Sequence, residues 1–240
     1  MTNGLLSKAK RKNYLFVEGS EDKHVFIHLL NSHGITTPDP AKREHFKDRD
    51  EHFGIKVCGS ITELLTAFRV ELKGDIDNKR YGIVIDADAD DNIDTDTGIT
   101  VNWRRLLNIL NNSGYSNLPL IPDDNGVKIK QDGLLPVVGI WVMPNNKLPG
   151  AIEDFVSFLG PEHDELWPIA ESACKQAISV KCNFRPTYTM KAHLHTWLAW
   201  QEEPGTPMGQ AITKKYVNAD APHALRFIAW FRNVFDLEIP

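Results

Sequence analysis

The sequence predicts an α/β protein with a mostly parallel sheet flanked by helices. In the first half of the chain, short apolar runs alternate with helical patterns. These runs are continuously apolar, which is typical of parallel strands covered on both faces. From Gly150 onward the pattern is helical only. We therefore expect a doubly wound layer followed by an all-helical extension.

Four segments are predicted as strands, namely 13–18 (NYLFVE), 54–58 (GIKVC), 81–86 (YGIVID) and 137–142 (VVGIWV). Helices are expected to begin at Ser20 and at Ser60, because serine favours the helix N-cap and apolar residues then recur at helical spacing. A third helix is predicted over about 101–111. Residues 35–53 are polar and are expected to form a loop.

The second half of the chain is predicted to contain helices near 151–159, 164–181, 188–202, 207–217 and 222–235, separated by glycine or proline. We place the domain boundary at residue 160. The α/β domain would cover 1–160, and the helical extension 161–240 would pack on it. Aromatic residues of this extension recur at helical spacing, which favours a role in the core over base stacking.

Composition restricts the class of protein. The chain has 240 residues and a net charge of −5, and its 42% hydrophobic content argues against extensive disorder. No apolar run approaches the roughly 20 residues that span a bilayer. Three scattered cysteines favour reduced thiols and a cytoplasmic location over a disulfide framework. The acidic balance argues against a DNA-coating protein, but it is compatible with an enzyme that binds metal ions.

An acidic residue closes the first predicted strand. Glu18 contributes nothing to an apolar core. Gly19 follows it, and we expect this glycine to permit a sharp turn out of the strand. Glu21 and Asp22 fall in the first helical turn, where the helix dipole alone would explain an acidic residue. Because ligands of such sheets bind at the carboxyl ends of the strands, Glu18 is a candidate for chemistry.

A second acidic group follows the third predicted strand, with the sequence Asp86-Ala87-Asp88. Strand alternation would put Asp86 and Asp88 on one face, where their repulsion needs a cation or a proton. Carboxylate oxygens suit Mg²⁺, so we predict metal binding for this pair. A calcium loop of the EF-hand kind is excluded, because Asp91 stands where that loop needs glycine. The acids at 91, 94 and 96 are interpreted as a solvated loop.

A third acidic group opens the helix after the fourth strand. Glu153 and Asp154 lie in the segment 143–154 (MPNNKLPGAIED), which brings them near the same edge of the sheet. Acids are common in first helical turns, so this group gains weight only from the other two.

Taken together, these residues resemble the Toprim domain, which is shared by topoisomerases, bacterial primases, recombination mediators and OLD-type nucleases. The family has a glutamate after its first strand and a DxD motif after a later one. Here these correspond to Glu18 and to Asp86 with Asp88, within about residues 13–155. The order of motifs and strands carries the resemblance, since short acidic motifs recur by chance.

Within this family the chain is most similar to the OLD-type nucleases. They place another acid four residues after the glutamate, here Asp22, and one after the strand that follows DxD, here Glu153. They also have a lysine near the metals, for which Lys191 is the better candidate and Lys147 the alternative. The segment 150–153 (GAIE) and the stretch 197–212 also look like a group of uncharacterised bacterial Toprim-like proteins. No GxxxxGK[ST] loop is present, so ATP-regulated cleavage would need a separate ATPase partner.

The resemblance implies a metal-dependent nuclease that uses Mg²⁺ or Mn²⁺, with DNA favoured over RNA as its substrate. Glu18, Asp22 and Asp86 would hold one cation, and Asp86, Asp88 and Glu153 would help to place a second about 4 Å away. Glu18 and Lys191 are also the candidate catalytic residues. The ammonium group of Lys191 could neutralise charge developing on the phosphate. A role in phage defence or DNA maintenance follows from the resemblance alone.

Three alternatives remain open at this point. One is a primase-like nucleotidyl transferase, and another is a non-catalytic module that binds nucleic acid or a partner protein. The third is a scaffold whose acidic residues bind a structural cation. The presence of both Glu18 and the complete DxD motif favours catalysis.

Overall fold

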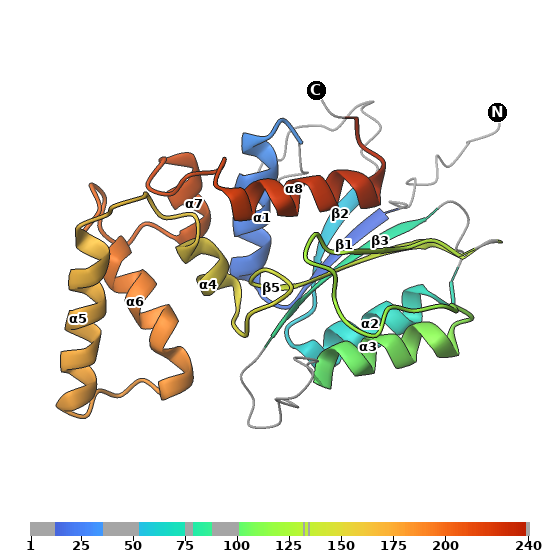
Figure 1. The fold of residues 1–240 in the computed structure, drawn as a ribbon, viewed down its shortest axis with the longest axis horizontal. Helices are drawn as coiled ribbons and strands as arrows, with labels where there is room; N and C mark the ends of the chain where they lie inside the picture. Colours follow the sequence, from blue (N-terminus) through green and yellow to red (C-terminus); the bar gives the residue numbers. More distant parts are fainter. Residues whose placement is uncertain are drawn as a thin grey trace, which may run out of the picture.

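The protein is described by a computed structural model that covers residues 13–35, 53–74, 79–87, 101–131, 133 and 135–238. Its centre is a five-stranded sheet with the strand order β2-β1-β3-β5-β4 (Figure 1). The strands are β1 (Asn13–Val17), β2 (Phe53–Val57), β3 (Arg80–Asp86), β4 (Val127–Ile129) and β5 (Val137–Met143). Strands β2, β1, β3 and β5 are parallel. The prediction of an α/β fold with a mostly parallel sheet is therefore confirmed.

Helices cover both faces of the sheet (Figure 1). Helices α2 (Ile61–Glu71) and α3 (Val101–Asn112) lie on one face, and α1 (Ser20–Ser32) and α8 (Pro222–Phe235) lie on the other. Alternate residues of each strand point to opposite cores, as the pleat requires. In β1, for example, Leu15 and Val17 belong to the α1–α8 core, whereas Phe16 belongs to the α2–α3 core.

Strand β4 was not predicted from the sequence. It is only three residues long and pairs with β5 in the antiparallel direction, so Val127 lies opposite Ile140. Val127 and Ile129 are buried while Lys128 points outward to bond the backbone oxygen of Asn233 at 2.6 Å. A lysine on a short edge strand discourages pairing with other chains.

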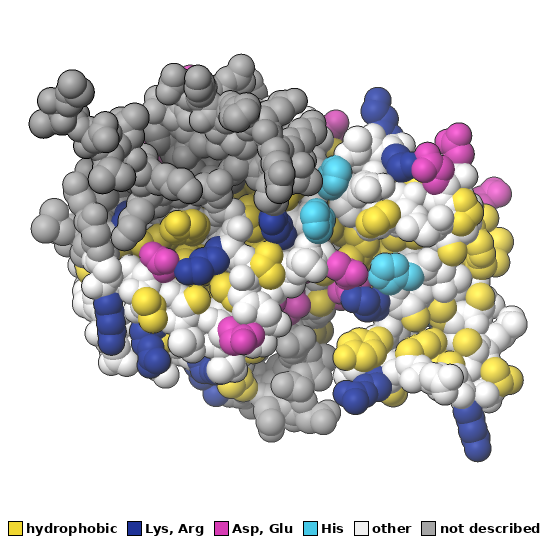
Figure 2. Space-filling model, turned by 180° about the vertical axis from the view of Figure 1, so that it is seen from behind, with side chains coloured by type: hydrophobic (Ala, Val, Ile, Leu, Met, Phe, Trp, Pro, Cys, Tyr) yellow, Lys and Arg dark blue, Asp and Glu magenta, His cyan; other side chains and the backbone are white. Residues whose placement is uncertain are grey.

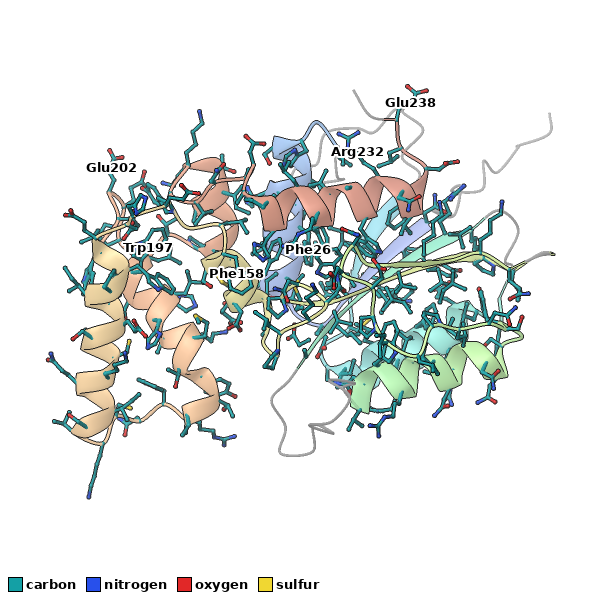
Figure 3. All side chains as sticks on the ribbon, viewed as in Figure 1. Phe26, Phe158, Trp197, Glu202, Arg232 and Glu238 are labelled. Atoms are coloured by element: carbon teal, nitrogen blue, oxygen red, sulfur yellow. The ribbon has the colours of Figure 1, made fainter. Side chains whose placement is uncertain are left out.

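Helix α8 is the last helix of the chain, yet it covers the middle of the sheet. Phe227 on α8 stacks on Phe26 of α1 with ring centroids 4.7 Å apart, and it meets Trp141 of β5 edge-on at 5.3 Å. Arg232 reaches from α8 to the end of α1, where it donates a hydrogen bond to the backbone oxygen of His33 at 2.8 Å (Figure 3). The C-terminal residues thus complete the hydrophobic core of the α/β layer.

The remaining helices lie beyond the carboxyl ends of the parallel strands (Figure 1). They are α4 (Ile152–Ser157), α5 (Leu166–Ser179), the short 3₁₀ turn Pro186–Tyr188, α6 (Thr189–Leu198) and α7 (Met208–Thr213). Trp197 of α6 is buried against Trp167 of α5, and its indole nitrogen donates to Asp164 Oδ1 at 3.1 Å (Figure 3). Among the described residues, no helix is long and apolar enough to cross a membrane.

Candidate metal site

Glu18 lies at the carboxyl end of β1, and backbone hydrogen bonds fix its position. The amide of Cys58 donates to Val17 O at 3.0 Å, and the amide of Gly59 donates to Glu18 O at 2.8 Å. These bonds continue the parallel pairing of β1 with β2 beyond the last strand residue. The Glu18 side chain is half-buried at this edge of the sheet.

Asp86 is the last residue of β3, which neighbours β1 in the sheet. Its backbone nitrogen lies 3.4 Å from Glu18 Oε1, so the two acidic residues occupy adjacent strand ends. Ala87 then forms a bridge with Gly150 through two backbone hydrogen bonds of 3.0 and 2.9 Å. This bridge draws the loop before α4 to the same edge. Asp88, the second acid of the DxD motif, lies outside the described residues.

The helices α1 and α4 begin with the same capping hydrogen bond, from a backbone nitrogen to the side chain of an aspartate three residues later. Asp22 Oδ2 accepts a hydrogen bond from Gly19 N at 2.7 Å, and Asp154 Oδ2 accepts one from Ala151 N at 2.9 Å. In each helix an aspartate in the first turn satisfies a backbone donor that the helix leaves unpaired. Gly19 has φ −108°, a conformation open to any residue, so the expectation that this turn needs glycine flexibility is wrong. Gly150, with φ +142°, is the position that favours glycine.

Glu153 is the most buried of the described candidate acids. Only 11% of its side chain is exposed, and Lys191 Nζ lies 2.9 Å from its Oε1. The same ammonium lies 3.1 Å from Glu21 Oε2, in the first turn of α1. Lys191 therefore joins α6 to both α1 and α4. A buried carboxylate is costly without such a partner, so this ion pair compensates for the burial of Glu153.

Burial and neighbouring charge shift two pKa values at this edge. Burial raises the pKa of Asp22 above its ordinary value, and the negative charges of Glu153 and Glu21 raise it further. The hydrogen bond from Gly19 N opposes this shift. Burial alone would lower the pKa of Lys191, but Glu153 and Glu21 outweigh that effect and raise it. Acidic side chains from the first turns of α1 and α4 are thus close enough to influence one another and Lys191.

Lys147, the alternative to Lys191, has a different partner. It follows β5 as expected, but its ammonium forms an ion pair with Asp124, in the loop before β4. Both side chains of this pair are about half exposed.

The structure brings Glu18 and Asp86 together at neighbouring strand ends, and Asp22, Glu153 and Lys191 together at the starts of α1, α4 and α6. Figure 2 shows acidic, basic and histidine side chains meeting near the middle of one face. Within the described part of the chain, no three histidine, cysteine or acidic side chains are grouped as around a metal ion. From the sequence, Glu21 was explained only by the helix dipole. Its partner Lys191 is 170 residues away in the chain, so no local sequence pattern indicates their contact.

Comparison with known protein families identifies the chain at the level of a family. A family model described as "Protein of unknown function (DUF3226)" matches residues 12–236, so the chain belongs to that family. No curated protein and no solved structure matches the chain.

Proposed function

We propose that the protein is a metal-dependent nuclease, built on a Toprim-like α/β layer, that cleaves phosphodiester bonds of nucleic acid. The observation that carries this proposal is the position of Glu18 and Asp86. These acids end two adjacent parallel strands, with Asp86 N 3.4 Å from Glu18 Oε1. Ligands of open α/β sheets bind at this edge, and acids there have no part in the apolar core.

The acidic residues at this edge fit Mg²⁺ or Mn²⁺ by their chemistry. Glu18, Asp22, Asp86 and Glu153 offer only carboxylate oxygens, which these ions prefer. Burial raises the pKa of Asp22, and a bound cation would oppose that shift by favouring the ionised carboxylate. Asp88 follows Asp86 by two residues and would complete the set. Bound cations would supply an activated water and stabilise the leaving oxygen.

Lys191 would act on the phosphate. Its Nζ lies 2.9 Å from Glu153 Oε1, so its positive charge is already at the proposed site. An ammonium held there can neutralise charge that develops on the phosphate during cleavage. The pairing of Lys147 with Asp124 favours Lys191 over Lys147 in this role.

The proposed substrate is DNA. Regulation of cleavage by ATP would require a separate ATPase as partner, because the sequence has no GxxxxGK[ST] motif. All three cysteines are free thiols, which supports the cytoplasmic location expected from the sequence.

The test is cleavage of supercoiled plasmid with Mg²⁺, Mn²⁺, Ca²⁺ or EDTA, combined with calorimetric titration of Mn²⁺. We expect the wild-type protein to cleave with Mg²⁺ or Mn²⁺, and Asp86→Ala to lose both cleavage and most Mn²⁺ affinity. Asp220→Ala is the control, since Asp220 is an exposed acid elsewhere on the surface. Equal losses in both variants would show that the acidic edge is not a site. Metal binding with primer synthesis from nucleotides and template, but no cleavage, would favour the nucleotidyl transferase.

The same assay decides between the two lysines. We expect Lys191→Ala to lose turnover while it keeps Mn²⁺ affinity, and Lys147→Ala to keep both. Lys191→Arg retains the ion pair with Glu153 but should restore only part of the rate, because the planar guanidinium places its charge differently. Thermal unfolding of each variant separates a loss of rate from a loss of folding. An inactive Lys147→Ala beside an active Lys191→Ala would mean that α6 has no catalytic part.

A further inference from the structure

Two glutamates, Glu21 of α1 and Glu153 of α4, contact the ammonium of Lys191. Glu21 Oε2 lies 3.1 Å from Lys191 Nζ, while Glu153 Oε1 lies 2.9 Å from the same atom. We propose that Glu21 is a positioning residue, which holds Lys191 in place for phosphodiester cleavage. This inference rests on the proposed function, but the contact on which it depends can be tested separately.

The two glutamates differ in what their ion pairs can do. The Glu153 side chain is 11% exposed, so its pair with Lys191 compensates a buried charge. The Glu21 side chain is 51% exposed, and exposed pairs of this kind contribute little to stability. A stability role therefore explains the Glu153 contact but not the Glu21 contact. What the Glu21 contact does supply is a second anchor that fixes the direction of a flexible side chain.

The second anchor matters most when Glu153 binds a cation. A carboxylate oxygen that coordinates a cation is less available to Lys191, so Lys191 would then depend on its other partner. Lysine has a long, flexible side chain with a compact charge, and a single contact leaves it many conformations. Glu21 lies in the first turn of α1, three residues after Glu18, so it is fixed to the same edge as the proposed metal ligands. Glu21 would keep the Lys191 ammonium at this edge while Glu153 coordinates a cation.

The main test compares cleavage rates of Glu21→Gln and Glu21→Asp, alone and combined with Lys191→Met. We expect Glu21→Gln to lower kcat by about 10- to 100-fold, as small displacements of a catalytic group do, with KM and Mn²⁺ affinity unchanged. Glu21→Asp keeps the charge and should recover part of the rate. In the Lys191→Met background, Glu21→Gln should have no further effect, because Glu21 acts through Lys191.

Glu171→Gln is the matched control. Glu171 pairs with Lys175 at 3.1 Å on the exposed surface of α5, so its replacement breaks an ion pair of the same length away from the site. This variant should cleave at the wild-type rate. A fall in Mn²⁺ affinity in Glu21→Gln would overturn the proposal, since Glu21 would then be a metal ligand. An undiminished effect in the Lys191→Met background would overturn it as well.

A spectroscopic measurement separates this inference from the proposed function. The ¹H–¹⁵N signal of the Lys191 ammonium should change position or broaden in Glu21→Gln and stay unchanged in Glu171→Gln. If wild-type protein cleaves no nucleic acid but this signal responds to Glu21→Gln, the nuclease proposal fails while the contact stands. If the signal does not respond, Glu21 does not hold Lys191, whatever the protein cleaves.

Discussion

At the scale of single residues, Asp22 links the stability of the protein to pH. Burial, followed by the charges of Glu153 and Glu21, raises its pKa in the folded protein above the unfolded value. The folded state then binds more protons than the unfolded state between those two pKa values. The contribution of Asp22 to stability is therefore highest below the unfolded pKa of about 3.9, and it falls as the pH rises toward the folded pKa.

We predict that Asp22→Asn reduces this fall. The asparagine side-chain oxygen can still accept from Gly19 N, so the start of α1 is retained while the titrating charge is removed. The measurement is the denaturant midpoint in EDTA from pH 4 to pH 7, which should decline less in Asp22→Asn than in the wild-type protein. Asp220→Asn, at an exposed acid, should follow the wild-type curve. A steeper decline in Asp22→Asn would contradict the direction of the shift.

At the scale of elements, two glycines allow α8 to lie close to the sheet. Gly82 of β3 and Gly139 of β5 are paired in register. A Cβ atom on Gly139 would lie 2.3 Å from Val234 Cγ2 of α8, and one on Gly82 would lie 3.1 Å from the ring of Phe235. The missing side chains therefore make the space that α8 occupies. This is a reason for glycine inside two otherwise apolar strands, where it usually weakens the strand.

We predict that Gly139→Ala destabilises the protein by about 1–3 kcal/mol, because an overpacked core must shift its backbone or side chains. Gly74→Ala is the control, since among the described residues its Cβ would meet only the backbone oxygen of Glu71, at 3.5 Å. The free energy of unfolding from denaturant titration gives both values. A Gly139→Ala variant as stable as wild type would show that α8 can move away from the sheet without cost.

The elements differ in how well the sequence predicts them, because only the longer ones contain a recognisable pattern of apolar residues. Strand β5 is a seven-residue apolar run and was predicted to within one residue. Strand β4 has three residues, too few for a pattern of period two to stand out. It forms a strand because its backbone pairs with β5, with Val127 opposite Ile140 and Ile129 opposite Val138, which is a tertiary effect.

At the scale of the whole molecule, the sequence predicts which residues end a strand but not which side chains meet. Glu18 and Asp86 could be placed at one edge because parallel strands share their carboxyl ends. The contact of Glu21 with Lys191 spans 170 residues, and it depends on how α6 packs beside α1 and α4. Such contacts leave no periodic signal in the sequence, so Glu21 could only be found in the structure.

The division of the chain at residue 160 is best tested by cutting it there. A fragment of residues 1–160 keeps every strand but lacks α8, whose Phe227 and Trp230 lie 5.3 and 5.6 Å from the ring of Trp141. Aromatic side chains each bury about 150–250 Å² and dominate core energetics, so the fragment would expose a large apolar face of its sheet. We predict that it does not fold cooperatively on its own.

The measurement is denaturant unfolding of the fragment, followed by near-ultraviolet circular dichroism, with the full chain as reference. The fragment should show no sharp transition, and it should bind a dye that reports exposed apolar surface, because secondary structure without tertiary packing has these properties. Addition of a separate 161–240 fragment should restore the transition if α8 can dock in its native place. A cooperative transition for 1–160 alone would instead mean that α1, α2 and α3 suffice to hold the sheet, and that α8 belongs to an extension that the α/β layer can lose.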